Sequence, residues 1–369
     1  MNLTPIINNF QRSIRKVQIC CILILSCTAC SLNIPYENQY SDPDAITTVT
    51  AARELLASAY DAIPKPEFSL SVLSDDFQPT FLINLNADLN NLYKWHPKPM
   101  EDLSNSLWEK YYSAIAIANT VLERVHYVSP ISDSDKQELQ CIVSEAKTLK
   151  AYCYFNLLRL FAPTYPEGPE KDGIILKERF ELAFLKRSSI SECVNAIRQL
   201  LTEAVTVDNR PSQVYWFSRQ SAYYLLAALE LYAENYDKAE EYALKILSST
   251  NAYDVLAPVH YKKLWEQEPC DECIFSLHTT NSYYTDMNYE RKKGDYFTIN
   301  STLTQLYAAN DIRYEATVYP QEMPGESIGE TLPVLYLGKY NKQNWNYKPI
   351  QYINKLRVSG VCFILAEAY

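Results

Sequence analysis

The most constraining feature of the sequence is a pair of adjacent helical patterns between Ser221 and Ser249. The segment reads SAYYLLAALELYAENYDKAEEYALKILSS, and its two patterns meet at Asn235. Small residues stand where the two helices would face each other, namely Ala227 in the first and Ala239 and Ala243 in the second. Because small side chains let two antiparallel helices approach closely, the segment predicts a tightly packed helical hairpin.

Helical periodicity recurs on the N-terminal side of this hairpin. A capped helix is predicted from Ser41 to Pro64, and others in DLSNSLWEKYYSAIAIANTVLERV, EAKTLKAYCYFNLLRLFAP and SISECVNAIRQLLTEAVTV. Aromatic residues at helical spacing are predicted to be core: Trp108, Tyr112, Tyr152, Tyr154, Tyr223 and Tyr224. Residues 65–99 read as irregular, polar and aromatic. Since one hairpin cannot bury a continuous core, the earlier helices would supply further, degenerate units. The sequence therefore predicts a mainly α fold, a tetratricopeptide-like helical scaffold with loop-rich insertions and a few short strands.

The chain changes character after Ser249. Residues 250–352 are weakly periodic and crowded with Tyr and Trp, with short strand-like runs in ECIFSLHTT and VLYLGKY. The last stretch, LRVSGVCFILAEAY, predicts a helix over about 356–369.

The N-terminus has the pattern of a bacterial lipoprotein signal. Basic residues up to Lys16 precede the apolar run VQICCILIL, and SCTACS follows. The run is well short of the roughly 20 residues that span a bilayer, so we predict a signal peptide over residues 1–29. Cys30 is the predicted lipidation site and Cys27 the alternative, while an ordinary secretory signal is the simpler interpretation. Lipidation would attach an otherwise soluble protein to a membrane.

Charge and composition exclude some classes of function. The 34 basic and 44 acidic residues give a net charge of −10, which argues against a nucleic-acid partner. There are 30 Tyr and 5 Trp against 7 Gly, which favours helices with many rings left for a contact surface.

Signals for catalysis or metal binding are weak. The sequence has no HExxH motif, no P-loop and no glycine-rich nucleotide fingerprint, so we predict no catalytic residue, no metal and no cofactor. Cys270 and Cys273 have CxxC spacing without a second pair, which indicates an ordinary pair of thiols or a local disulfide in preference to zinc. The histidines show no ligand spacing: His96, His126, His260 and His278.

Taken in order, these segments resemble those of the SusD-like (RagB/SusD) outer-membrane nutrient-binding lipoproteins. The cues run through the whole chain: the lipoprotein cysteine, NIPYENQYSDPDAITT, LWEKYYSAIAIANTVLERV, EAKTLKAYCYFNLLRLFAP, AEEYALKIL, ECIFSL, NDIRYE and a terminal AEAY. The resemblance implies one domain over residues 30–369, with a helical scaffold at about 41–249, an aromatic loop-rich region at about 250–352 and a final helix at 356–369.

The resemblance also implies a function. It describes a lipid-anchored protein of the outer membrane that faces the cell exterior, is not an enzyme, and binds oligosaccharide or polysaccharide. It would deliver this ligand to a SusC-like TonB-dependent transporter. Alternatives are a helical-repeat lipoprotein that binds peptide or protein, a surface hydrolase, or a truncated remnant without function.

Three features depart from the family pattern. Lys150 stands where members often carry Arg, and Gly360 where the pattern places an acidic residue. Members continue beyond the AEA element, so the chain resembles a C-terminally truncated member. We therefore expect an incomplete final helix that lacks its packing partner and exposes Val361, Phe363 and Leu365.

Candidate ligand contacts are polar and aromatic residues in predicted loops. Rings can stack on the C–H faces of sugars, while amides and carboxylates bond to hydroxyl groups. The segment before LWEKYY supplies Trp95, Tyr93, Asp75, Asp76, Asn84 and Asn86. Two further zones supply Tyr283 and Tyr284, with Asp286 and Tyr289, and Trp345, with Asn344 and Tyr347. The simpler alternative is that Trp95 packs beneath its loop, since Trp is highly buried on average. Asp311 and Arg313 are expected to form a structural ion pair or a turn.

Overall fold

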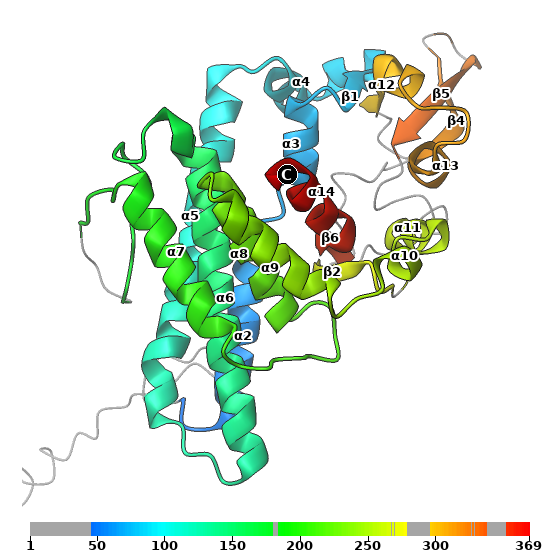
Figure 1. Cartoon of the computed structure of the whole chain (residues 1–369). Coiled ribbons are helices and arrows are strands. Elements are labelled where there is room, and N and C mark those ends of the chain that lie inside the picture. Colours follow the sequence, from blue (N-terminus) through cyan, green and yellow to red (C-terminus); the bar gives the residue numbers. More distant parts are fainter. Residues whose placement is uncertain are drawn as a thin grey trace, which may run out of the picture. The chain divides into compact units, whose positions relative to one another are not determined.

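The helical scaffold is a stack in which each helix packs on the next in chain order (Figure 1). The computed structural model describes residues 46–179, 184–266, 268, 270–278, 296–325, 327, 329–337 and 352–369. The stack consists of α2 (Val49–Ala62), α5 (Pro97–Arg124), α6 (Asp133–Phe161), α7 (Ile190–Ala204), α8 (Arg219–Tyr232) and α9 (Tyr236–Leu247). The predicted mainly α, tetratricopeptide-like fold is confirmed.

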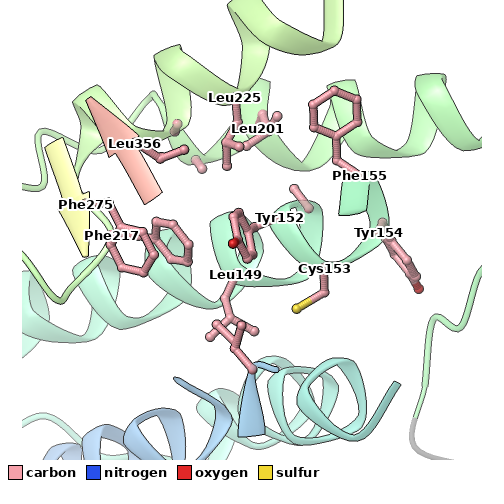
Figure 2. Close-up of a cluster of buried hydrophobic side chains, with 14 of the residues drawn as sticks. Leu149, Tyr152, Cys153, Tyr154, Phe155, Leu201, Phe217, Leu225, Phe275 and Leu356 are labelled. Carbon is pink, nitrogen blue, oxygen red and sulfur yellow. The ribbon is translucent and has the colours of Figure 1, made fainter. Parts of the chain in front are cut away.

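The central helix α6 begins with a capping box and has a long apolar face. Ser132 and Asp135 form a reciprocal capping box at its start, and Pro163 follows two residues after its end. The helix begins well before the predicted segment EAKTLKAYCYFNLLRLFAP. Its buried face meets residues from distant parts of the chain. Figure 2 shows Tyr152 beside the stacked rings of Phe217 and Phe275, which lie 3.9 Å apart.

The hairpin of α8 and α9 forms as predicted. Ala227, Ala239 and Ala243 are all completely buried between the helices, so the small residues do permit the close approach. At the turn, the Asn235 side chain donates to Glu230, and Glu230 also accepts from Arg198 of α7. This nearly buried carboxylate therefore ties the hairpin to the preceding helix.

Two predicted segments differ in the structure. The first helix is α2, capped by the Thr48 hydroxyl, which accepts from the Ala51 N–H at 3.1 Å; Asp42 to Asp44 lie outside the described residues. Residues 65–99 are not irregular, because they contain α3 (Glu67–Leu73), β1 (Phe77–Pro79), the 3-10 helix η2 (Phe81–Leu85) and α4 (Ala87–Tyr93). These elements are short and are held by polar caps and distant apolar partners, so they leave little local periodicity to detect.

The strands described form three two-stranded antiparallel sheets. β1 pairs with β3 (Phe297–Ile299), β2 (Cys273–His278) with β6 (Tyr352–Arg357), and β4 (Val318–Pro324) with β5 (Thr331–Leu337). Phe77 lies opposite Ile299, and Leu277 opposite Ile353. The predicted strands in ECIFSL and VLYL are confirmed by β2 and β5. Short helices complete the described elements: η3 (Val125–Tyr127), η4 (Tyr165–Glu167), α10 (Ala252–Val255), α11 (Pro258–Trp265), α12 (Ser301–Gln305) and α13 (Ile312–Thr317).

The last helix, α14 (Val358–Ala368), does have a packing partner. It lies against α8 and α9 (Figure 1), so Val361 is completely buried. Leu365 packs on the main core, which is the larger hydrophobic cluster and contains the buried residues of the helical stack. The expectation that both would be exposed is wrong, because the α8–α9 hairpin supplies the surface that covers them. Phe363 is 73% exposed, as expected. Gly360 permits the contact, since a Cβ there would lie 2.4 Å from the Tyr224 hydroxyl.

Within the described part of the chain, no helix combines the length and the apolar character needed to cross a membrane.

Candidate functional site

A second hydrophobic cluster, here called the small core, supports the segment that carries most of the candidate residues. It brings the elements of residues 67–93 together with strands more than 200 residues later in the chain. Its buried members are Val72, Phe77, Ile83, Leu92, Phe297, Ile299 and Val318. The small core thus fixes α3, β1, η2 and α4 into one support for exposed side chains.

Trp95 lies at the end of α4 and points its ring to solvent. Its side chain is 61% exposed, so the alternative that it packs beneath its loop is wrong. The Trp95 N–H donates to Leu92 O and the His96 N–H to Asn91 O, both at 2.9 Å, which are the two bonds of a Schellman motif. Trp95 occupies the left-handed position of that motif, with φ of 57°, where glycine is usual. A bulky residue there is strained, and strained backbone concentrates at functional sites.

Two of the neighbouring candidates have structural roles. Tyr93 packs into the small core, with its ring centre 5.9 Å from that of Phe297. Asn86 caps α4, because its side-chain oxygen accepts from the Leu89 N–H at 3.1 Å. Asn84 is exposed and accepts from Asn90. Asn86 and Trp95 stand at opposite ends of α4, roughly 13 Å apart at 1.5 Å per residue.

The two aspartates lie at the start of β1. Asp75 is exposed and Asp76 is half-buried, with its backbone oxygen accepting from the Asn300 N–H at 2.9 Å. Asp76 is close enough to Tyr307 to contribute, after burial, to the raised pKa of that phenol. The structure thus places Asp75 and Asp76 on the small core, like Trp95.

Two tyrosines near Asp76 were missed by the sequence analysis. Tyr307 and Tyr314 meet edge to face at 5.7 Å, and the Arg313 guanidinium lies 5.4 Å from the centre of the Tyr307 ring. The predicted structural role of Asp311 and Arg313 is confirmed by an ion pair of 2.6 Å and by the cap that Asp311 places on α13. The only local signal for the tyrosines was their proximity in sequence to that pair.

The other candidate zones fall on parts of the chain that the structure does not describe. Tyr283, Tyr284 and Trp345, with their polar neighbours Asp286, Tyr289, Asn344 and Tyr347, lie outside the described residues, as do Cys27 and Cys30. These assignments stay predictions.

The described residues offer little for metal or nucleophilic chemistry. They contain no cluster of three or more His, Cys, Asp or Glu that could hold a metal ion, and Cys270 and Cys273 are free thiols. Residues 325–329 read GESIG, the letter pattern of a serine nucleophile elbow. That elbow requires a strand-to-helix turn, whereas this segment connects the antiparallel strands β4 and β5. The pattern therefore lacks its structural context.

Similarities to known proteins extend over most of the chain. Residues 35–231, more than half of it, match a SusD-like family model described as starch-binding and associating with the outer membrane. A curated SusD-like protein of Formosa agariphila is 25% identical over 232 residues, which cover 61% of this chain and 42% of the relative. The chain thus spans about two fifths of the length of that relative.

Solved structures share the fold. A SusD superfamily protein of Bacteroides vulgatus matches with a TM-score of 0.69 at 20% identity, covering 87% of this chain and 75% of that one. A SusD-like carbohydrate binding protein of the same species matches with a TM-score of 0.68 at 16% identity, covering 87% and 71%. At these identities the likeness concerns the fold alone.

Proposed function

The chain belongs to the SusD-like family, and from this premise we propose that it is a cell-surface glycan-binding lipoprotein that delivers oligosaccharide to a TonB-dependent outer-membrane transporter. The observation that carries the glycan role is the ring of Trp95, which is exposed to solvent on a strained backbone. An exposed indole contributes little to the stability of the fold. It suits a surface that holds an apolar face of a ligand.

The exposed candidates of this segment have the chemistry that a glycan requires, with Asn84 and Trp95 on opposite sides of α4 in the sequence. An exposed ring can stack on the C–H face of a pyranose, while the carboxylate of Asp75 and the amide of Asn84 can bond to hydroxyl groups. All three residues are supported by the small core, so little ordering is needed when a ligand binds. Because the platform is open, ligand can also leave readily, which delivery to a transporter requires.

Calorimetric titration of the full chain with a panel of neutral oligosaccharides and polysaccharides tests this role. In the variant Trp95→Gly the ring is lost while the left-handed backbone becomes favourable, so the variant should fold and bind at least about tenfold more weakly. Glu234→Gly is the matched control, because Glu234 has φ of 58° at the same position of the motif that ends α8. Unchanged affinity in Trp95→Gly, measured against this control, would remove the proposed platform.

Membrane attachment is proposed to be through acylation at Cys30, with Cys27 as the alternative. Each acyl methylene buried in a bilayer contributes about 0.8 kcal/mol, so loss of acylation should release the protein from membranes. Cys30→Ser and Cys27→Ser expressed in a bacterial host, with metabolic fatty-acid labelling and membrane fractionation, identify the acceptor. Labelling that persists in both single variants and in the double variant would refute acylation at either cysteine.

The transporter partner and the lack of catalysis are the remaining parts of the proposal. We expect the chain to co-purify with a SusC-like TonB-dependent transporter encoded beside it. We also expect no new reducing ends when the chain is incubated with the glycans that it binds. A sustained release of reducing ends by the purified chain would favour the surface hydrolase instead.

A peptide-binding role is the second candidate, and one observation bears on it. Residues 174–177 lie against α5 and α6, where the hydroxyls of Tyr112 and Tyr154 bond to the backbone of Ile175 and Lys177. The chain's own backbone thus occupies a position that a peptide would use in an open helical groove. This arrangement favours glycan binding on the small core as the leading proposal.

A further inference from the structure

A pocket of about 670 Å³ lies where the loop before α8 meets the start of α8 and the end of α9. We call it the α8 pocket. It shares no lining residue with the small core or with the segment of Trp95. Its volume is in the range of about 300–1,000 Å³ that is typical of small-molecule sites.

The lining of the α8 pocket carries more positive than negative charge. Arg210, Arg219 and Lys245 line it together with a single carboxylate, Asp208. Asp208 accepts from Arg210 at 3.0 Å and from Arg219 at 3.2 Å, so one carboxylate serves two guanidinium groups. The pKa of Asp208 is lowered, and the hydrogen bond from Arg210 is the largest cause. The carboxylate is therefore ionised at neutral pH. Lys245 is itself paired with Glu241 at 2.9 Å, so the uncompensated positive charge of the lining comes from the two arginines that share Asp208.

The other lining groups suit a polyhydroxylated anion. Ser218 and Gln220 place the first turn of α8 at the pocket. The Arg219 and Ser221 N–H groups already bond to Asn209 O and Ser218 Oγ, so the turn contributes the positive end of the helix dipole there. The Ser248 and Ser249 hydroxyls at the end of α9 donate to backbone oxygens of that helix, so their oxygens can accept from the hydroxyl groups of a sugar. Tyr223 is also in the lining, where its ring stacks on Tyr242 and lies beneath Arg219 and Lys245, so it helps to hold these two cations in place.

The loop that forms one wall is anchored from beneath. The Asn209 side chain is buried and donates to Phe217 O at 2.9 Å and to Glu145 at 3.2 Å. The Arg219 N–H donates to Asn209 O at 2.9 Å. Because these bonds fix the loop, the pocket is preformed and a ligand need not order it.

A second cavity, which shares the loop of residues 208–212 with the α8 pocket, has the opposite balance of charge. It measures about 620 Å³ and is lined by Glu138, Glu145 and Asp208 against Arg53 and Arg210. Acidic groups outnumber basic ones there, so an anion is disfavoured. Asp208 and Arg210 line both cavities, so the difference in charge comes from Arg219 and Lys245 on the α8 side.

We propose that the α8 pocket is a second ligand site that binds the carboxylate of an acidic sugar, such as a uronic-acid residue. Arg210 and Arg219 would bond to the carboxylate, and Ser248 and Ser249 would contact the sugar ring. The carboxylate part rests on the pocket alone, while the choice of a saccharide rests on the proposed glycan function.

The test compares trigalacturonic acid with its fully methyl-esterified form, in calorimetric titrations of the full chain. Esterification removes the charge and keeps the rings and linkages. The acid should bind at least about tenfold more tightly than the ester, since charged hydrogen bonds are among the stronger polar contacts. Arg210→Gln should weaken binding of the acid by about tenfold, and folding should be unaffected because the Arg210 side chain is 80% exposed. Arg159→Gln, an exposed arginine on α6, is the matched control.

The outcomes separate this site from the Trp95 platform. Binding of the acid that survives Trp95→Gly but falls in Arg210→Gln supports the α8 pocket. Equal affinities for acid and ester, or equal effects of Arg210→Gln and Arg159→Gln, overturn it. Acetate that binds as tightly as the acid overturns the saccharide assignment. If neutral glycans give no heat while the acid still binds, the proposed platform fails and the α8 pocket stands.

Discussion

At the scale of single residues, Trp95 and Glu234 occupy equivalent strained positions. Both follow a helix in a Schellman motif and have left-handed backbone, with φ of 57° and 58°. Both side chains are exposed, so neither substitution leaves a cavity. We predict that Trp95→Gly and Glu234→Gly each leave the free energy of unfolding unchanged or raise it by about 0.5–1 kcal/mol. Denaturant unfolding measures this, and a loss of more than about 1 kcal/mol in Trp95→Gly would mean that the ring packs.

Lys150 gives a pH-dependent prediction. Its side chain is almost buried, and burial lowers its pKa from 10.5 to about 8. Below pH 8 the lysine is protonated in the folded and the unfolded state, so the folded state bears the full cost of burying the charge. That cost declines as the pH rises from 8 towards 10.5, because only the unfolded state stays protonated there.

The variant Lys150→Met should therefore be more stable than the wild type at pH 7, by on the order of 1–2 kcal/mol. Its advantage should shrink between pH 8 and 10. Urea unfolding of both proteins at each pH gives the difference in the free energy of unfolding. Tyrosines also titrate in this range, but they are common to both proteins, so their effect cancels in the difference. An advantage that stays constant with pH would contradict the assignment.

In the segment that ends at Trp95, the sequence shows which residue types are present but not which role each residue has. It singled out Trp95, yet it could not show that the ring is exposed, because exposure depends on the backbone bonds that end α4 and on the small core. Tyr93 and Asn86 have the same residue chemistry as ligand contacts, but packing on Phe297 and capping of α4 use them instead. Side-chain type alone does not separate these uses.

At the scale of elements, the contact of α14 with α8 depends on one missing Cβ. A methyl group at position 360 would lie 2.4 Å from Tyr224 Oη and 3.2 Å from two ring carbons. Helix propensity favours alanine over glycine by about 1 kcal/mol, but overpacking opposes it by about 1–3 kcal/mol. We predict that Gly360→Ala lowers the free energy of unfolding by about 1 kcal/mol.

A double-mutant cycle with Tyr224→Phe checks the cause. Removal of the hydroxyl leaves the closest remaining atoms at 3.2 Å, so Gly360→Ala should be clearly less harmful when it is combined with Tyr224→Phe. Thermal unfolding of the four proteins gives the coupling. A coupling of zero would place the clash elsewhere.

Elements differ in how far the sequence could predict them. The helices α5 and α7, the second half of α6, and the α8–α9 hairpin were predictable, because periodic apolar faces and small residues are local signals. The elements of residues 65–99 were not, since η2 and α4 are short and depend on caps from Thr80 and Asn86. The pairing of Phe77 with Ile299 joins residues more than 200 positions apart, and no local pattern indicates it.

At the scale of the whole molecule, the two hydrophobic clusters support different proposed sites. The main core unites the helical stack with β2, β6 and α14, and the α8 pocket opens on its surface. The small core has only seven buried members among the described residues and supports the proposed Trp95 platform. Because fewer buried contacts resist its opening, the platform should have lower local stability than the stack.

Hydrogen exchange of the full chain, followed by mass spectrometry, should show this division. Amides of α3 and α4 should exchange faster than those of the buried part of α6, because they pack mainly on the small core. A neutral glycan that binds at Trp95, present at about 100 times its Kd, should add about 2.7 kcal/mol of protection to α4, which slows exchange there about a hundredfold. The start of α8 should not change with that ligand, whereas trigalacturonic acid should protect it and leave α4 unchanged. Equal exchange in α4 and α6 without ligand would show that the two cores open together, and protection of both regions by one ligand would show that the two sites are coupled.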